Sequence, residues 1–256
     1  MITLGIRVYA LGALALGLVG LAWDDFALQW QPVPAGVPGR AALACVFAAA
    51  LVAAAVAVNL RPAAAVGAAA LCGLFALVVL LHAPEVVTHP LVVGAWSGLA
   101  EQLALCSAGL IAWALLAAPG GRAAGAGAPG RYAFGACLLV FGLAHFFYLD
   151  FTAGMVPKWL PPGQTFWAVV TGVAHVAAGV AILARRWAHL AAVLLAVMFA
   201  GFGILIHAPL LLADPHSHLN WVMNAMNLAL TGSAWVMADA LAARRPAVSA
   251  AVAASR

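Results

Sequence analysis

Eight apolar stretches run through this chain, and they restrict its fold more than any other feature. They lie at residues 4–23, 41–59, 63–82, 95–118, 133–149, 165–184, 188–208 and 220–242. A helix that crosses a bilayer needs ~20 mostly apolar residues, which is the length of these stretches. Only 7% of the residues are charged, whereas a soluble domain carries roughly 25%. We therefore predict an all-α membrane protein with eight transmembrane helices.

The charges between these stretches predict how the chain is oriented in the lipid bilayer. On one side of an eight-span arrangement lie Arg7, Arg61, Arg122, Arg131, Arg185, Arg186, Arg244, Arg245 and Arg256, and on the other only Arg40 and Lys158. The positive-inside rule then places both termini in the cytoplasm. The basic residues stand singly or in pairs and form no phosphate-binding run, so no nucleic-acid partner is expected.

The two halves of the chain match at a constant offset of 125 residues. Asp25-Phe26 corresponds to Asp150-Phe151, His82-Ala83-Pro84 to His207-Ala208-Pro209, and Trp96 to Trp221. A Gly/Ala/Pro-rich segment at 119–131 separates the halves and is typical of a linker. Each half has four stretches, so the fold class is two four-helix bundles in a parallel repeat. The predicted units are 1–118, the linker 119–131, 132–243, and a cytoplasmic tail 244–256.

Polar side chains inside a membrane are costly and are therefore candidates for function. In the second half they gather toward the outer leaflet, and we select His145, Tyr148, His175, His207, Asn224 and Asn227 as the lining of a pocket. Asp150 and Lys158 are placed at its mouth. The first half has Gly20 and Ala50 where the second has His145 and His175, so the first unit is interpreted as a degenerate copy.

Three interpretations of these polar residues remain open. They could hydrogen-bond between helices and fix the packing. They could form a pocket for a quinone, whose carbonyl groups need donors such as His, Asn or Tyr. They could form a haem or metal site, because imidazole is a common ligand of both. No metal site is predicted, and a quinone is favoured over haem. The four cysteines form no C-x-x-C and are interpreted as small buried residues.

The second half resembles the DoxX-like family of small four-helix bacterial membrane proteins. The resemblance is carried by Phe141-Gly-Leu-Ala-His-Phe, Asp150-Phe-Thr-Ala-Gly-Met-Val-Pro-Lys-Trp-Leu-Pro, Thr171-Gly-Val-Ala-His and His207-Ala-Pro, over about residues 133–212. It implies a four-helix bundle per unit and a bacterial inner-membrane location. Founding members are similar to a membrane subunit of a thiosulfate:quinone oxidoreductase. By position, His145, His175 and His207 would be the characteristic histidines of the family.

The resulting functional hypothesis is a redox-associated membrane protein that binds a quinone and works with a partner redox subunit. The first alternative is a membrane assembly or scaffold protein whose His and Asn residues serve packing alone. The second is a transporter, for which Glu101 is the one charge well inside a span. That alternative is disfavoured because no spans interrupted by proline are expected at matching positions. A homo-oligomer is compatible with each hypothesis.

Overall fold

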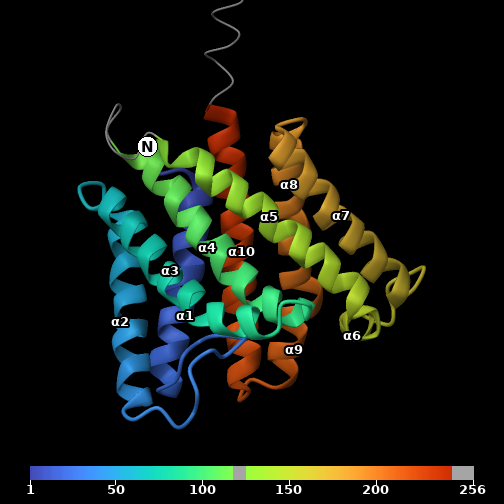
Figure 1. Ribbon diagram of the computed structural model, residues 1–256, viewed down its shortest axis with the longest axis horizontal. Coiled ribbons are helices and arrows are strands. Elements are labelled where there is room, and N and C mark those ends of the chain that lie inside the picture. Colours follow the sequence, from blue (N-terminus) through green and yellow to red (C-terminus); the bar gives the residue numbers. More distant parts are fainter. Residues whose placement is uncertain (118–124, 244–256) are drawn as a thin grey trace, which may run out of the picture.

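A computed structural model describes residues 1–117 and 125–243, and its regular structure there is entirely helical (Figure 1). The first half contains α1 (Leu4–Trp23), α2 (Arg40–Asn59), α3 (Ala64–Thr88) and α4 (Val93–Leu116). The second half contains α5 (Gly127–Phe147), the short α6 (Leu149–Met155), α7 (Gln164–Ala184) and α8 (Ala188–Phe202). A π-helical turn, η2 (Gly203–His207), joins α8 to α9 (Ala208–Ala213), and α10 (His218–Ala243) follows.

Seven of these helices are long and apolar enough to cross a membrane. They are α1 to α5, α7, and the continuous helix of α8, η2 and α9. Large apolar side chains also cover the outside of the bundle, as shown by Val46, Leu80 and Ile204, which are 71%, 68% and 70% exposed. Such a surface suits hydrocarbon rather than water. The helices are therefore those of a multi-pass membrane protein, and the all-α class is confirmed for the described residues.

The first helix of each half packs against the last helix of the other half. Helix α1 lies against α10 as well as α2, and α5 lies against α4 as well as α7, while α4 and α10 meet in the middle of the bundle. One core results, which includes Tyr9 of α1, Leu105 of α4, Phe134 of α5 and Met237 of α10. The two halves therefore share their interior.

Glycines allow α1 and α10 to approach to backbone contact. A Cβ atom on Gly12 would overlap the backbone of Ala229, and one on Gly232 would overlap the backbone of Tyr9. Close approach of this kind is a common basis of helix association in membranes, where dispersion contacts replace the hydrophobic effect. The Tyr9 hydroxyl next to this crossing donates to the Leu105 carbonyl oxygen at 2.9 Å. The crossing thus also connects to α4.

Two helices continue past prolines that lie just beyond the predicted stretches 63–82 and 188–208. Helix α3 contains Pro84 and extends to Thr88, and the α8–η2–α9 helix contains Pro209 and extends to Ala213. His82 and His207 were predicted at helix ends and instead lie inside their helices. Pro84 and Pro209 lie at matching positions of the two halves, and neither proline ends its helix. A proline removes one backbone hydrogen bond, which a helix tolerates when neighbouring helices and local π turns satisfy the freed groups.

The predicted linker is shorter than expected. Helix α5 begins at Gly127, so residues 127–131 are helical, with Pro129 in the first turn where its missing N–H costs little. Arg131 was predicted in a connection but is only 6% exposed, and its Nη1 donates to the carbonyl oxygens of Ile182 and Leu183 at 2.6 and 3.0 Å. Residues 119–124 of the linker and the tail 244–256 lie outside the described residues.

The α1–α10 crossing predicts a strong response to one added methyl group. Gly232→Ala should lower the free energy of unfolding by about 1–3 kcal/mol, because the new Cβ meets backbone that cannot move aside. Gly73→Ala is the matched control, since Gly73 lies inside α3 with no atom near its Cβ position. That variant should be neutral or up to ~1 kcal/mol more stable. Denaturant unfolding of the purified proteins measures both, and equal stability of the two variants would contradict the crossing.

Candidate functional site

Two of the predicted site residues form a pair in the interior of the second half. His145 lies in the last turn of α5 and His175 near the middle of α7, and their ring centroids are 4.8 Å apart. His175 is 1% exposed, whereas His145 is partly exposed. A ligand that approaches the pair therefore meets His145 first.

Hydrogen bonds within each helix fix the tautomers of the two imidazoles. Nδ1 of His145 lies 2.7 Å from the Phe141 carbonyl oxygen, and Nδ1 of His175 lies 2.8 Å from the Thr171 carbonyl oxygen. A carbonyl oxygen only accepts, so each Nδ1 must carry the hydrogen and donate it. In the neutral rings Nε2 then holds a lone pair. The pair presents two such Nε2 atoms, both of which can accept a hydrogen bond.

Aromatic rings surround His175. The ring centroids of Phe141, Phe199 and Phe202 lie 6.0, 5.5 and 6.2 Å from that of His175. Histidines that together ligate one haem stand on opposite faces of the macrocycle, whereas these two imidazoles touch each other. The arrangement therefore leaves no room for a porphyrin between them. In residues 1–117 and 125–243 no group of three His, Cys, Asp or Glu side chains could hold a metal ion.

The two asparagines of the predicted pocket bind backbone carbonyls of the neighbouring helix. Asn227 donates through Nδ2 to the Phe199 carbonyl oxygen at 3.0 Å, and Asn224 donates to that of His207 at 2.8 Å and to that of Asn220 at 2.9 Å. These carbonyls belong to α8, η2 and α10, and the η2 turn interrupts the regular α-helical bonding. Packing of α10 on α8 thus uses these amide hydrogens.

The backbone and the ring of His207 differ in their hydrogen bonding. Its backbone carbonyl oxygen accepts a hydrogen bond from Asn224, while its ring nitrogen Nδ1 is buried with no hydrogen-bond partner in the described part of the chain. His207 is five residues beyond Phe202 on the same continuous helix, or ~7.5 Å along its axis at 1.5 Å per residue. No ring contact among the described residues joins His207 to the histidine pair or to the phenyl rings around it.

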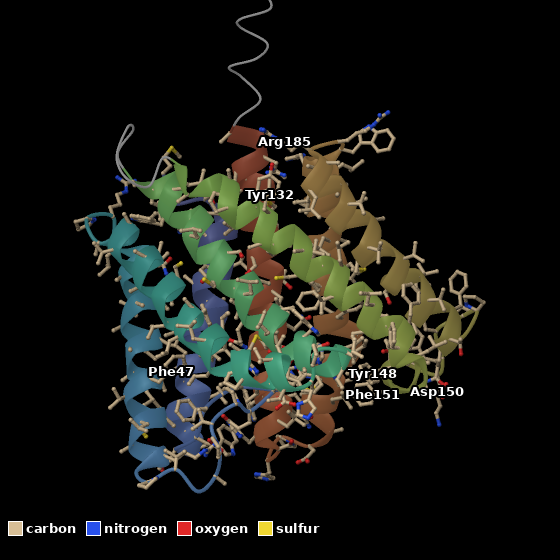
Figure 2. All side chains as sticks on the ribbon, in the orientation of Figure 1. Phe47, Tyr132, Tyr148, Asp150, Phe151 and Arg185 are labelled. Carbon is tan, nitrogen blue, oxygen red and sulfur yellow. The ribbon has the colours of Figure 1, made fainter. Side chains whose placement is uncertain are left out.

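Of the remaining three predicted residues, Tyr148 and Asp150 lie near α6 at one end of the second half (Figure 2). The Tyr148 hydroxyl accepts from the backbone N–H of Gly94 at 3.0 Å, which joins the end of α5 to the start of α4. Asp150 is exposed on α6. Lys158 lines a groove between the α6–α7 connection and the η2–α9 helix, with Trp159 and Pro209. No hydrogen bond or ring contact among the described residues joins these three side chains to the histidine pair.

The first half also has a polar interior, although it was interpreted as a degenerate copy. His82, Glu101 and Gln102 are 4%, 7% and 1% exposed. Gln102 donates through Nε2 to the Glu101 carboxylate at 3.3 Å, while its own oxygen and Nε2 of His82 have no partner in the described residues. His82 could be found from its match to His207. The burial of Gln102 could be found from its position inside the predicted span 95–118, because a polar side chain in a span is costly to expose to lipid.

A thiol pair is a further contact that the sequence did not predict. The Sγ atoms of Cys72 on α3 and Cys106 on α4 lie 3.7 Å apart. Their separation of 34 residues corresponds to no known cysteine motif, and only the packing of α3 against α4 brings them together. The interpretation of all four cysteines as buried holds for Cys137 alone, since the other three are partly exposed.

Comparison with known proteins gives one match. Residues 134–238 match a family described as a domain of unknown function, DUF8561. The matched stretch begins in α5 and ends in α10, so it contains the histidine pair, the asparagines and η2. It covers less than half of the 256 residues. No curated protein and no solved structure matches the chain.

The hydrogen bond from Asn227 predicts a stability effect. Asn227→Ala should lower the free energy of unfolding by about 1–2 kcal/mol, because it removes the hydrogen bond between helices and leaves the Phe199 carbonyl oxygen with only the Gly203 N–H of its own helix as a donor. Asn59→Ala is the control, since Asn59 is exposed at the end of α2 and bonds only to the Ala55 carbonyl of its own helix. Its loss should change stability by less than about 0.5 kcal/mol. Thermal unfolding in detergent compares the two, and a neutral Asn227→Ala would rule out the packing role.

Proposed function

We propose that this chain is a DoxX-like, redox-associated membrane protein that binds the headgroup of a quinol at His145 and His175. The carrying observation is the imidazole pair itself, with both Nδ1 donors engaged by their own helices and both Nε2 atoms left as acceptors. A site that lacks charge and is enclosed by phenyl rings suits a neutral aromatic ligand.

The tautomers favour the reduced form of the ligand. The hydroxyl groups of a quinol donate hydrogen bonds, and Nε2 of a neutral imidazole with hydrogen on Nδ1 accepts them. A quinone offers only carbonyl oxygens, which would find no donor on the same two atoms. Phe141, Phe199 and Phe202 supply apolar surface for the ring, and the hydrocarbon tail would lie in the surrounding lipid. The protein is therefore proposed to bind quinol more tightly than quinone.

The frame of the site is proposed to be a duplicated unit of four spans, with α10 as the eighth. Helices α2, α3 and α4 start at residues 40, 64 and 93, and helices α7, α8 and α10 start at residues 164, 188 and 218. The corresponding starts are therefore 124, 124 and 125 residues apart. Two tryptophans 125 residues apart support this, since Trp96 and Trp221 donate through Nε1 to the carbonyls of Pro90 and Pro215, each at 2.9 Å.

The proposed setting is the bacterial inner membrane, with both termini in the cytoplasm and a partner redox subunit to exchange electrons. The excess of arginine in the connections on one side supports this orientation. A scaffold protein without a ligand is the second candidate. The observation in its favour is that the amides of Asn224 and Asn227 donate hydrogen bonds to backbone carbonyls of the neighbouring helix, as expected for residues that serve packing.

Binding of decylubiquinol to the purified full chain tests the proposal. His145→Phe and His175→Phe keep an aromatic ring of similar size and remove Nε2, so each should weaken binding about tenfold or more through the lost hydrogen bond. His216→Gln is the control, because His216 is exposed in the connection before α10, and its affinity should equal that of the wild type. Quenching of tryptophan fluorescence gives the dissociation constants, and thermal unfolding confirms that each variant is folded.

The same titration separates the two candidate functions. Wild-type affinity in a folded variant with both histidines replaced would refute the quinol site. So would an unsubstituted protein that binds no decylubiquinol and releases no quinone into a solvent extract. Either result would leave the scaffold as the better account of the buried histidines.

A further inference from the structure

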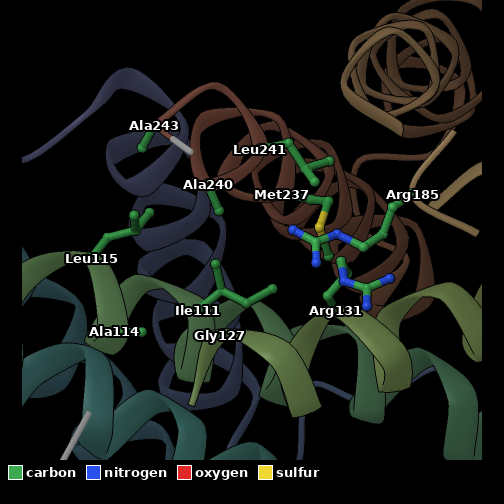
Figure 3. Close-up of a pocket in the computed structure, with 10 residues that line it drawn as sticks. All are labelled: Ile111, Ala114, Leu115, Gly127, Arg131, Arg185, Met237, Ala240, Leu241 and Ala243. Atoms are coloured by element: carbon green, nitrogen blue, oxygen red, sulfur yellow. The ribbon is translucent and has the colours of Figure 1, made fainter. Parts of the chain in front are cut away.

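A hollow opens at the face of the bundle where α1 begins and α10 ends, far from the histidine pair along α5 and α7. Its walls come from the ends of α4, α5 and α10, and Arg185 reaches it from the turn between α7 and α8 (Figure 3). Figure 3 shows the guanidinium groups of Arg131 and Arg185 close together beside Met237. Two cationic groups thus meet in one hollow.

Arg131 is held in place while part of its guanidinium stays available. Its side chain is 6% exposed, and Nη1 donates to the Ile182 and Leu183 carbonyl oxygens at the end of α7. A guanidinium has five N–H donors, and these two bonds use only the donors of one nitrogen. Within residues 1–117 and 125–243 neither Nε nor Nη2 of Arg131, nor the guanidinium of Arg185, hydrogen-bonds to an acceptor. Both groups line the hollow.

The described residues supply no counter-charge for this pair. Their ion pairs are Arg40 with Asp25 and His89 with Glu85, both away from the hollow. Asp239 of α10 is turned to α1, where its Oδ2 accepts from the Gly5 N–H at 3.2 Å. Two like charges beside low-dielectric walls repel each other, so an anion between them would be favourable.

The rest of the hollow is apolar. Ile111 and Leu115 of α4 and Met237 and Leu241 of α10 form its walls. The hollow also lies at the ends of membrane-length helices, which is the level of lipid headgroups. Basic pockets between membrane helices at this level suit phosphate groups of anionic lipids.

We propose that this hollow binds the phosphate of an anionic phospholipid. The guanidiniums of Arg131 and Arg185 would hold the phosphate oxygens in the forked geometry that arginine favours. The glycerol and the first acyl carbons would contact the walls of α4 and α10. Inorganic phosphate shares the charge but has no use for those apolar walls, so the lipid is the favoured source of the phosphate.

Lipid titration of the delipidated full chain tests this site. Phosphatidylglycerol, added in mixed micelles and followed by native mass spectrometry, should bind at least tenfold more tightly than phosphatidylcholine. Arg185→Gln should reduce the affinity for phosphatidylglycerol about tenfold, because one charged hydrogen-bonding group is lost. Arg186→Gln is the matched control with wild-type affinity, since the Arg186 guanidinium stacks on Trp187 at 5.1 Å and does not line the hollow.

Arg131 needs a milder substitution because it also binds the end of α7. Arg131→Lys keeps the charge and removes the fork, so it should fold and still weaken lipid binding several-fold. Millimolar inorganic phosphate should not displace the lipid. The proposal is overturned if phosphatidylglycerol binds the Arg185→Gln and wild-type proteins equally. It is also overturned if inorganic phosphate binds in an Arg185-dependent way while phosphatidylglycerol does not.

Discussion

Hydrocarbon offers no hydrogen bonds, so every polar group of a buried helix has to be satisfied from within the protein. The α8–η2–α9 helix is where this requirement is hardest to meet, since it contains a π turn and a proline. Helix α10 adds two hydrogen bonds to this helix: Asn224 donates to the His207 carbonyl oxygen, and Asn227 donates to that of Phe199, which also accepts from the Gly203 N–H. The cost is a helix of lower hydropathy, and α10 packs among α1, α4 and α8, where lipid contact is reduced. Both the asparagines of α10 and its central position thus agree with the requirement that polar groups avoid hydrocarbon.

The asparagines and the histidines in the interior of the second half differ in which of their hydrogen-bonding groups remain without a partner. The asparagine amides donate hydrogen bonds to the backbone of the neighbouring helix, so packing alone explains their positions. Each imidazole instead bonds to a carbonyl of its own helix, four residues earlier. That bond fixes the ring without joining two helices, and Nε2 is not needed for it. Packing therefore accounts for the positions of Asn224 and Asn227 better than for the contact of His145 with His175.

The sequence was sufficient for features that depend on hydropathy along the chain. The window 4–23 coincides with α1, and 165–184 differs from α7 by one residue. It was insufficient at prolines, because whether a helix passes Pro84 or Pro209 depends on how the freed backbone groups are satisfied in the folded bundle. The linker was overestimated because Gly, Ala and Pro can also open a helix, as they do before the buried Arg131. Hydropathy cannot distinguish such a helix start from a loop.

The sequence could select polar side chains in the interior of the second half, but it could not predict which of them are in contact. His145 and His175 were selected for their type and depth, and the structure brings them into contact. Tyr148, Asp150 and Lys158 have similar depth, but the rotation of each helix and the path of α6 place them elsewhere. The rotations of the helices about their axes also place Cys72 next to Cys106 and Arg131 next to Arg185. Contacts of this kind join residues that are far apart in the chain, so no local pattern contains them.

The exchange of helices between the halves has a consequence for biosynthesis. Gly12 of α1 meets Ala229 of α10, so α1 contacts a helix that is synthesised much later than itself. A chain that leaves the ribosome from its N-terminus cannot complete this contact until α10 has been synthesised. During that time the face of α1 that will receive α10 has only lipid or the insertion machinery against it. Final assembly of the first half therefore waits for the synthesis of α10.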